Sequence, residues 1–84
     1  MNPPRLKLYV RQDCHLCEDM VQQLHELQLE YTFDWVTLDV DARPDWAEAM
    51  GDKVPLLIAG ETEICRYFLD LQALTRCLGA AAPD

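Results

Sequence analysis

The chain has 84 residues, of which 50% are apolar and 26% are charged, and its formal net charge is −8. This length and composition are typical of one small folded domain and argue against a disordered chain. Because an excess of acidic groups repels phosphates and anionic lipids, nucleic acid and membrane surfaces are not expected partners.

The first half of the chain predicts a strand, a helix and a second strand. Residues 6–10 form an apolar, β-like run. A helix is predicted over 15–27, because apolar residues recur there every three or four positions: Leu16, Met20, Val21, Leu24 and Leu27. Residues 32–40 are rich in β-branched and aromatic side chains and should form the second strand. Two strands joined through a helix are expected to pair in parallel as a right-handed βαβ unit.

The second half predicts a short helix, a hairpin and a last helix. Asp39 and Asp41 are placed to cap a helix that Pro44 opens and that runs to Met50. Strands are predicted at 54–59 and 62–67 around the turn signal Gly60-Glu61. Leucines at 71, 74 and 78 mark the last helix, which should stop near residue 79. The whole chain, 1–84, is therefore one α/β domain of order β-α-β-α-β-β-α, with 1–5 and 80–84 expected to fray.

The motif Cys14-His15-Leu16-Cys17 lies where the first strand gives way to the first helix. Two cysteines three positions apart share one side of the first helical turn and are close enough to bridge. The first thiol faces unpaired backbone N–H groups and the positive end of the helix dipole, and both favour the thiolate. Strand, Cys-x-x-Cys and helix in this order predict a dithiol redox site.

With this motif and the Val54-Pro55 dipeptide before the third strand, the chain resembles the glutaredoxins, in particular the small bacterial glutaredoxin-like proteins. The resemblance spans roughly residues 6–78 and implies a thioredoxin-like fold, a four-stranded mixed sheet flanked by helices. It also implies that Cys14 is the exposed nucleophile and Cys17 the resolving thiol. Pro55 matches a cis-proline, and the backbone of Val54 would then pair with a bound peptide or glutathione.

The region around the fourth strand departs from the family pattern. Glutaredoxins usually carry a Gly-Gly pair and an acidic residue there, which hold glutathione, whereas this chain reads Glu63-Ile64-Cys65-Arg66-Tyr67. The difference favours a protein disulfide slightly over glutathione as the substrate. Cys65 is either a third redox thiol near Cys14 or a half-buried strand cysteine, and its apolar neighbours favour packing. Cys77 is expected to pack in the last helix.

Charged residues around the dithiol act in opposite directions. Asp13, Glu18 and Asp19 oppose ionisation of Cys14, whereas Arg11 favours it. Arg11 could alternatively pair with a substrate carboxylate, and a solvated surface charge is the favoured interpretation. His15 would either stabilise the thiolate as an imidazolium or point to water.

The sequence also indicates a compartment. Residues 1–5 lack the apolar segment of a secretory signal, and no apolar run reaches the length of a membrane span. The spacing of the four cysteines does not suggest a disulfide scaffold. A cytoplasmic location with mostly reduced thiols is therefore expected.

The sequence thus predicts a thiol–disulfide oxidoreductase in which Cys14 attacks a substrate disulfide and Cys17 resolves the intermediate. The candidate substrate-binding residues are Arg11, His15, Val54, Pro55 and Cys65. We expect a monomer without metal or bound cofactor, whose substrate is a protein disulfide or whose co-substrate is glutathione. Two alternatives stay open: a redox-inactive binding module of the thioredoxin fold, and a zinc or iron–sulfur carrier, which needs ligands beyond one Cys-x-x-Cys.

Overall fold

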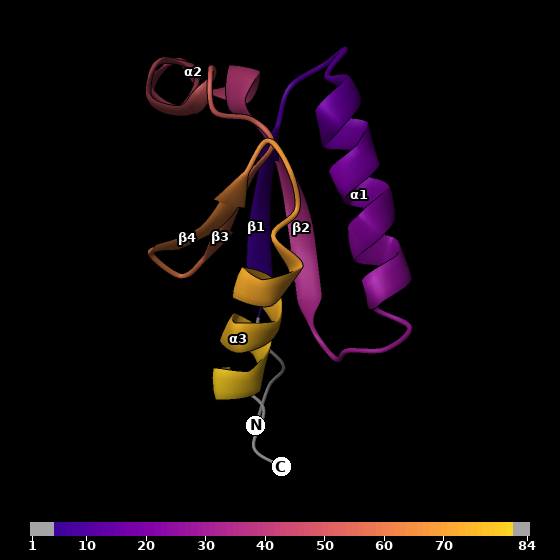
Figure 1. Ribbon diagram of the computed structural model, residues 1–84. Coiled ribbons are helices and arrows are strands. Elements are labelled where there is room, and N and C mark those ends of the chain that lie inside the picture. The colour runs from indigo at the N-terminus through magenta and orange to yellow at the C-terminus, as the bar shows by residue number, and fades with distance from the viewer. Residues whose placement is uncertain (1–4, 82–84) are drawn as a thin grey trace.

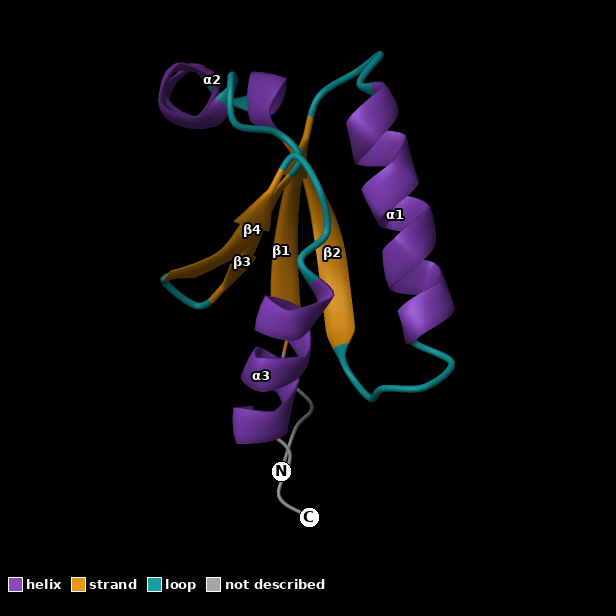
Figure 2. Ribbon diagram, viewed as in Figure 1, coloured by secondary structure: helices purple, strands orange, loops and turns teal. Residues whose placement is uncertain are grey.

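The computed structural model describes residues 5–81 and contains a four-stranded sheet with three α-helices and one short 3-10 helix (Figure 2). In chain order the elements are β1 (Arg5–Val10), α1 (His15–Leu27), β2 (Asp34–Asp39), η1 (Val40–Ala42), α2 (Pro44–Met50), β3 (Leu56–Ala59), β4 (Thr62–Arg66) and α3 (Leu71–Ala81). The order β-α-β-α-β-β-α, the parallel βαβ unit and the hairpin are confirmed.

The sheet is mixed, with strand order β2-β1-β3-β4. Strand β1 pairs in parallel with β2 and antiparallel with β3, and β3 pairs antiparallel with β4. Gly60 allows the tight β3–β4 turn because its φ of 62° lies in the left-handed region, where glycine meets no Cβ penalty. The central position of β1 matters for the site, since the chain leaves β1 directly toward the two cysteines.

The two faces of the sheet carry separate apolar clusters, because successive side chains of a strand point to opposite faces. On one face, leucines of β1 and β3 pack with buried residues of α1 and α3: Leu6, Leu8, Leu57, Met20, Leu24, Leu74 and Leu78. On the other face Tyr9, Val40 and Leu56 pack with Trp46 of α2. Helix α2 and the start of α1 lie at the same end of the sheet, where β1 stops (Figure 1).

Several predicted boundaries were wrong. Strand β2 begins only at Asp34, although Phe33 before it is buried in the core, and β3 begins after the buried Pro55. Asp39 caps η1 by accepting from the Asp41 N–H at 2.9 Å, whereas α2 begins after Arg43 without a side-chain cap.

The first and last elements also extend further than predicted, into the segments expected to fray. Arg5 belongs to β1, and α3 continues through residues 80 and 81. Residues 1–4 and 82–84, the rest of the segments expected to fray, lie outside the described residues. Among residues 5–81, no helix combines the length and the apolar character needed to cross a membrane.

Candidate active site

The two cysteines of the motif form a disulfide across the first turn of α1. Cys14 is the N-cap residue, with extended backbone (φ −103°, ψ 103°), and its Sγ accepts a hydrogen bond from the Cys17 N–H at 3.1 Å. This is the sulfur-to-backbone contact expected at a helix N-terminus. Cys14 is half-exposed, whereas Cys17 is only 3% exposed. Cys14 is therefore the more accessible of the two cysteines.

The residue before the dithiol makes the turn into the helix. Asp13 has a φ of 57°, in the left-handed region, where Asp is tolerated better than most residues because its short side chain can bond locally. The turn ends β1 and aims the chain into α1, so that Cys14 stands at the cap. Asp13 and His15 flank Cys14 and are both exposed.

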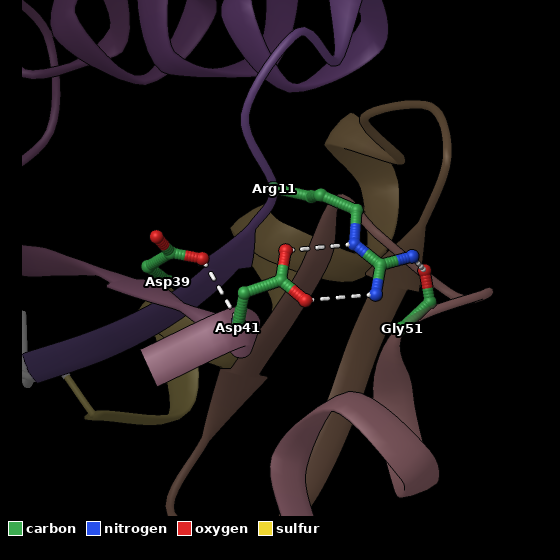
Figure 3. A network of polar contacts seen from close by, with 4 residues as sticks. All are labelled: Arg11, Asp39, Asp41 and Gly51. Carbon is green, nitrogen blue, oxygen red and sulfur yellow. Dashed lines mark hydrogen bonds and ion pairs between the residues drawn. The ribbon is translucent and has the colours of Figure 1, made fainter. Parts of the chain in front are cut away.

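Arg11 is held by a polar network within the chain (Figure 3). Its Nε and Nη2 donate to the two carboxylate oxygens of Asp41, each at 3.0 Å, and its Nη1 donates to the Gly51 carbonyl at 3.1 Å. The guanidinium holds the pKa of the Asp41 carboxyl below its ordinary value through this hydrogen bond. Arg11 is therefore not a free solvated charge, and its planar fork is already paired with a carboxylate of this protein.

The loop between Gly51 and Pro55 is held from two sides. Besides the bond from Arg11 to Gly51, the Tyr67 hydroxyl donates to the Asp52 carbonyl and the Tyr67 N–H donates to the Pro55 carbonyl, each at 2.8 Å. The Val54–Pro55 peptide bond is cis. The network thus links the segment before the dithiol, this loop and the turn after β4.

Sequence reasoning missed the roles of Tyr67, Asp41 and Gly51. Tyr67 has a φ of 68°, which is rare for a bulky residue and costs about 1–2 kcal/mol, and no local sequence signal indicates it. Arg11 and Asp41 lie 30 positions apart, so their pairing depends on the sheet that brings β1 and η1 together.

A groove of about 490 Å³ opens beside the dithiol and follows one face of α1. It is lined by Val10 and Arg11 at the end of β1, by both cysteines, and along α1 by Glu18, Val21, Gln22, His25 and Glu26. Residues three and four apart share a helix face, so the spacing from Cys14 could have identified this surface. At the end of the groove far from the cysteines, the ring of His25 packs edge-on against the ring of Trp35 in β2. The two ring centroids are 5.0 Å apart.

The remaining cysteines lie away from this groove. Cys65 is 8% exposed and belongs to the cluster that packs against α1 and α3. Burial raises the pKa of its thiol, which keeps it in the unreactive protonated form. Its position fits the packing interpretation and not that of a third redox thiol. Cys77 is a free, half-exposed thiol of α3.

Comparisons with known proteins place the chain. Residues 5–79 match the family described as glutaredoxin-like domain (DUF836). The protein Rv0508 of Mycobacterium tuberculosis is 33% identical over 75 residues, which cover 83% of this chain and 77% of that protein. The Mb0520 protein of Mycobacterium bovis matches with the same identity and coverage.

Solved structures give the same result. The solution structure of protein Ne2328 from Nitrosomonas europaea has a TM-score of 0.84 at 33% identity, covering 94% of this chain and 95% of that one. The X-ray structure of XcR50 from X. campestris has a TM-score of 0.71 at 30% identity, covering 93% and 99%. Thioredoxin 1 from Thermosipho africanus, at 17% identity and a TM-score of 0.60 over 92% and 97%, shares the fold alone. The chain therefore has the thioredoxin fold and belongs to the glutaredoxin-like domain (DUF836) family.

Proposed function

We propose that this protein is a thiol–disulfide oxidoreductase that reduces disulfides through Cys14 and Cys17. The observation that carries the proposal is the asymmetry of the pair. Cys14 is partly exposed and its sulfur accepts a hydrogen bond from a backbone N–H at the helix N-terminus, whereas Cys17 is buried. A nucleophile needs access and a stabilised thiolate, and a resolving thiol needs only to reach the first sulfur.

The reaction runs in two exchanges. The Cys14 thiolate attacks one sulfur of the substrate disulfide, the substrate S–S bond breaks, and the second substrate sulfur leaves as a thiolate. A mixed disulfide now joins Cys14 to the substrate. Cys17 then attacks the Cys14 sulfur, forms the Cys14–Cys17 disulfide and releases the remaining substrate thiol. Two electrons pass from the protein dithiol to the substrate, and an external dithiol must reduce the protein again.

Other residues supply docking and support in this proposal. The backbone of Val54, beside Pro55, pairs with the segment of the substrate that carries the disulfide, and exposed His15 borders the attacking sulfur. Arg11 acts as a positioning residue, because its guanidinium ties the segment before Cys14 to Asp41 and Gly51. We favour protein disulfides over glutathione as substrates, and a monomer acting in the cytoplasm, where dithiols can be kept reduced.

Trapping of the mixed disulfide tests the proposal. In a Cys77→Ser background, which removes the other half-exposed thiol, Cys17→Ser should accumulate a covalent adduct with a disulfide-linked peptide, because resolution is blocked. The matched Cys14→Ser variant should form none. If neither variant forms an adduct, or if Cys14→Ser traps as much as Cys17→Ser, the oxidoreductase proposal is wrong and a redox-inactive binding module becomes the better account.

A further inference from the structure

The groove along α1 is continuous with the dithiol, because Cys14 and Cys17 are themselves part of its wall. Its volume of about 490 Å³ lies in the range of ligand sites in proteins. Val10, Val21 and Cys17 give it an apolar lining beside the reactive sulfur. A substrate bound at Cys14 can therefore bury an apolar side chain next to its disulfide.

The groove wall carries negative charge from helix α1. Helix α1 contains three acids, Glu18, Asp19 and Glu26, and neither lysine nor arginine. Glu18 and Glu26 belong to the groove wall and are both exposed. The positive charge of Arg11, which also lines the groove, is balanced by the carboxylate of Asp41, with which it forms a bidentate ion pair. The ring of His25 packs against Trp35. Within residues 5–81 neither Glu18 nor Glu26 forms an ion pair, so the groove presents two unpaired carboxylates to a bound substrate.

From this we propose that the groove selects disulfide substrates in extended polypeptide segments with an apolar residue and a lysine or arginine close to the reactive cysteine. The inference rests on the proposed oxidoreductase function and names its substrate class. Glutathione, which carries two carboxylates and one ammonium group, has the opposite charge to the one this wall attracts. Basic side chains of a peptide would pair with the wall and steer the encounter.

Helix geometry sets the position of the basic residues. At about 1.5 Å of rise per residue, Glu18 lies about 6 Å along the helix axis from Cys14, and Glu26 about 18 Å. An extended peptide advances about 3.3 Å per residue. A basic residue about two positions from the substrate cysteine therefore meets Glu18, and one about five positions away meets Glu26.

Single-turnover kinetics with charge-matched peptides test this. The reduced protein is mixed at about pH 8, where histidine is ordinarily uncharged, with disulfide-linked dimers of two peptides. Both place leucine beside the cysteine and differ only in lysine or glutamate two positions away on each side. We expect the lysine peptide to react roughly fivefold faster or more at low salt, with a ratio that shrinks as salt is added.

Variants locate the effect. The double variant Glu18→Gln/Glu26→Gln should at least halve the lysine-to-glutamate rate ratio. Glu30→Gln/Glu61→Gln changes the net charge equally, at exposed positions by the opposite end of the sheet, and should leave the ratio unchanged. Equal rates for the two peptides, or an equal loss of preference in both double variants, would overturn the inference while leaving the oxidoreductase function intact. Failure of both peptides to react would overturn that function, and this inference with it.

Discussion

Replacing Gly51 with alanine tests how tightly the loop that accepts the Arg11 hydrogen bond is packed. A Cβ at this position would lie 2.5 Å from the Ala47 carbonyl oxygen and 2.9 Å from Arg11 Nη2. Gly51 has a φ of −59°, so alanine fits the backbone conformation itself. The closer neighbour is main chain and cannot swing aside as a side chain can. The end of α2 must therefore shift, and the carbonyl that accepts from Arg11 shifts with it.

The magnitude follows from two opposing effects. Overpacking of a tight site costs about 1–3 kcal/mol. Replacing glycine with alanine also removes freedom from the unfolded chain, which stabilises by about 0.4–1 kcal/mol. Because the closest contact is with main chain at 2.5 Å, the upper part of the overpacking range applies, about 2–3 kcal/mol, and we expect Gly51→Ala to lower the free energy of unfolding by about 1–2.5 kcal/mol. For a domain of this size the melting temperature should then fall by about 4–20 °C.

Thermal unfolding of the oxidised protein, followed by circular dichroism, measures this change. Gly79→Ala is the matched control, because a Cβ at Gly79 in α3 meets no atom within 4 Å. There alanine should stabilise by up to about 1 kcal/mol. Because the backbone contact is the closer one, Gly51→Ala should remain destabilising in an Arg11→Met background. A Gly51→Ala protein as stable as the wild type would refute the packing described here.

Three further predictions concern single groups. Cys65 should react with iodoacetamide at least about tenfold more slowly than Cys77, since it is buried and its thiol pKa is raised, and similar rates measured by mass spectrometry would contradict its place in the core. The lowered pKa of Asp41 stabilises the fold above the ordinary value of 3.8, and this contribution is lost as pH falls through the folded pKa. The stability difference between wild type and Asp41→Asn in urea should therefore shrink below about pH 3.8, and a difference that persists in acid would contradict the ion pair. Tyr67→Phe should cost about 0.5–1.5 kcal/mol in urea unfolding through the lost bond to Asp52, and an unchanged midpoint would show that this bond contributes nothing.

Local signals predicted the elements well where they alone decide the structure. Helix α1 was predicted with its observed bounds, because its apolar period and the cap at Cys14 are both properties of a short segment. The β3–β4 hairpin followed from Gly60 for the same reason. Strand ends were less predictable. Phe33 and Pro55 are buried without belonging to a strand. At these positions the apolar residue type indicates burial and does not indicate strand pairing.

The position of the cysteine pair was predictable from the sequence, whereas the contacts that support it were not. The spacing of Cys14 and Cys17 identifies the pair in the sequence, and their disulfide across the first turn of α1 is confirmed. The contacts of Arg11 with Asp41 and of Tyr67 with Asp52 join residues 30 and 15 positions apart. Such contacts exist only once the sheet has formed, and each partner alone looks like an ordinary polar residue of a loop. Cys65 is the opposite case, because its thiol suggested a possible redox role from the sequence, whereas the residue packs in the hydrophobic core.

The most direct test of the account is a redox titration in which every cysteine is identified. The protein is equilibrated across glutathione buffers, quenched by alkylation, and its four cysteines are mapped by mass spectrometry. We predict that a Cys14–Cys17 disulfide forms at a potential reached in the cytoplasm and that Cys14 is the fastest thiol to alkylate in the reduced protein. If Cys14 reacts no faster than Cys77, and no bridge between Cys14 and Cys17 forms at any buffer ratio, the dithiol is not a redox site.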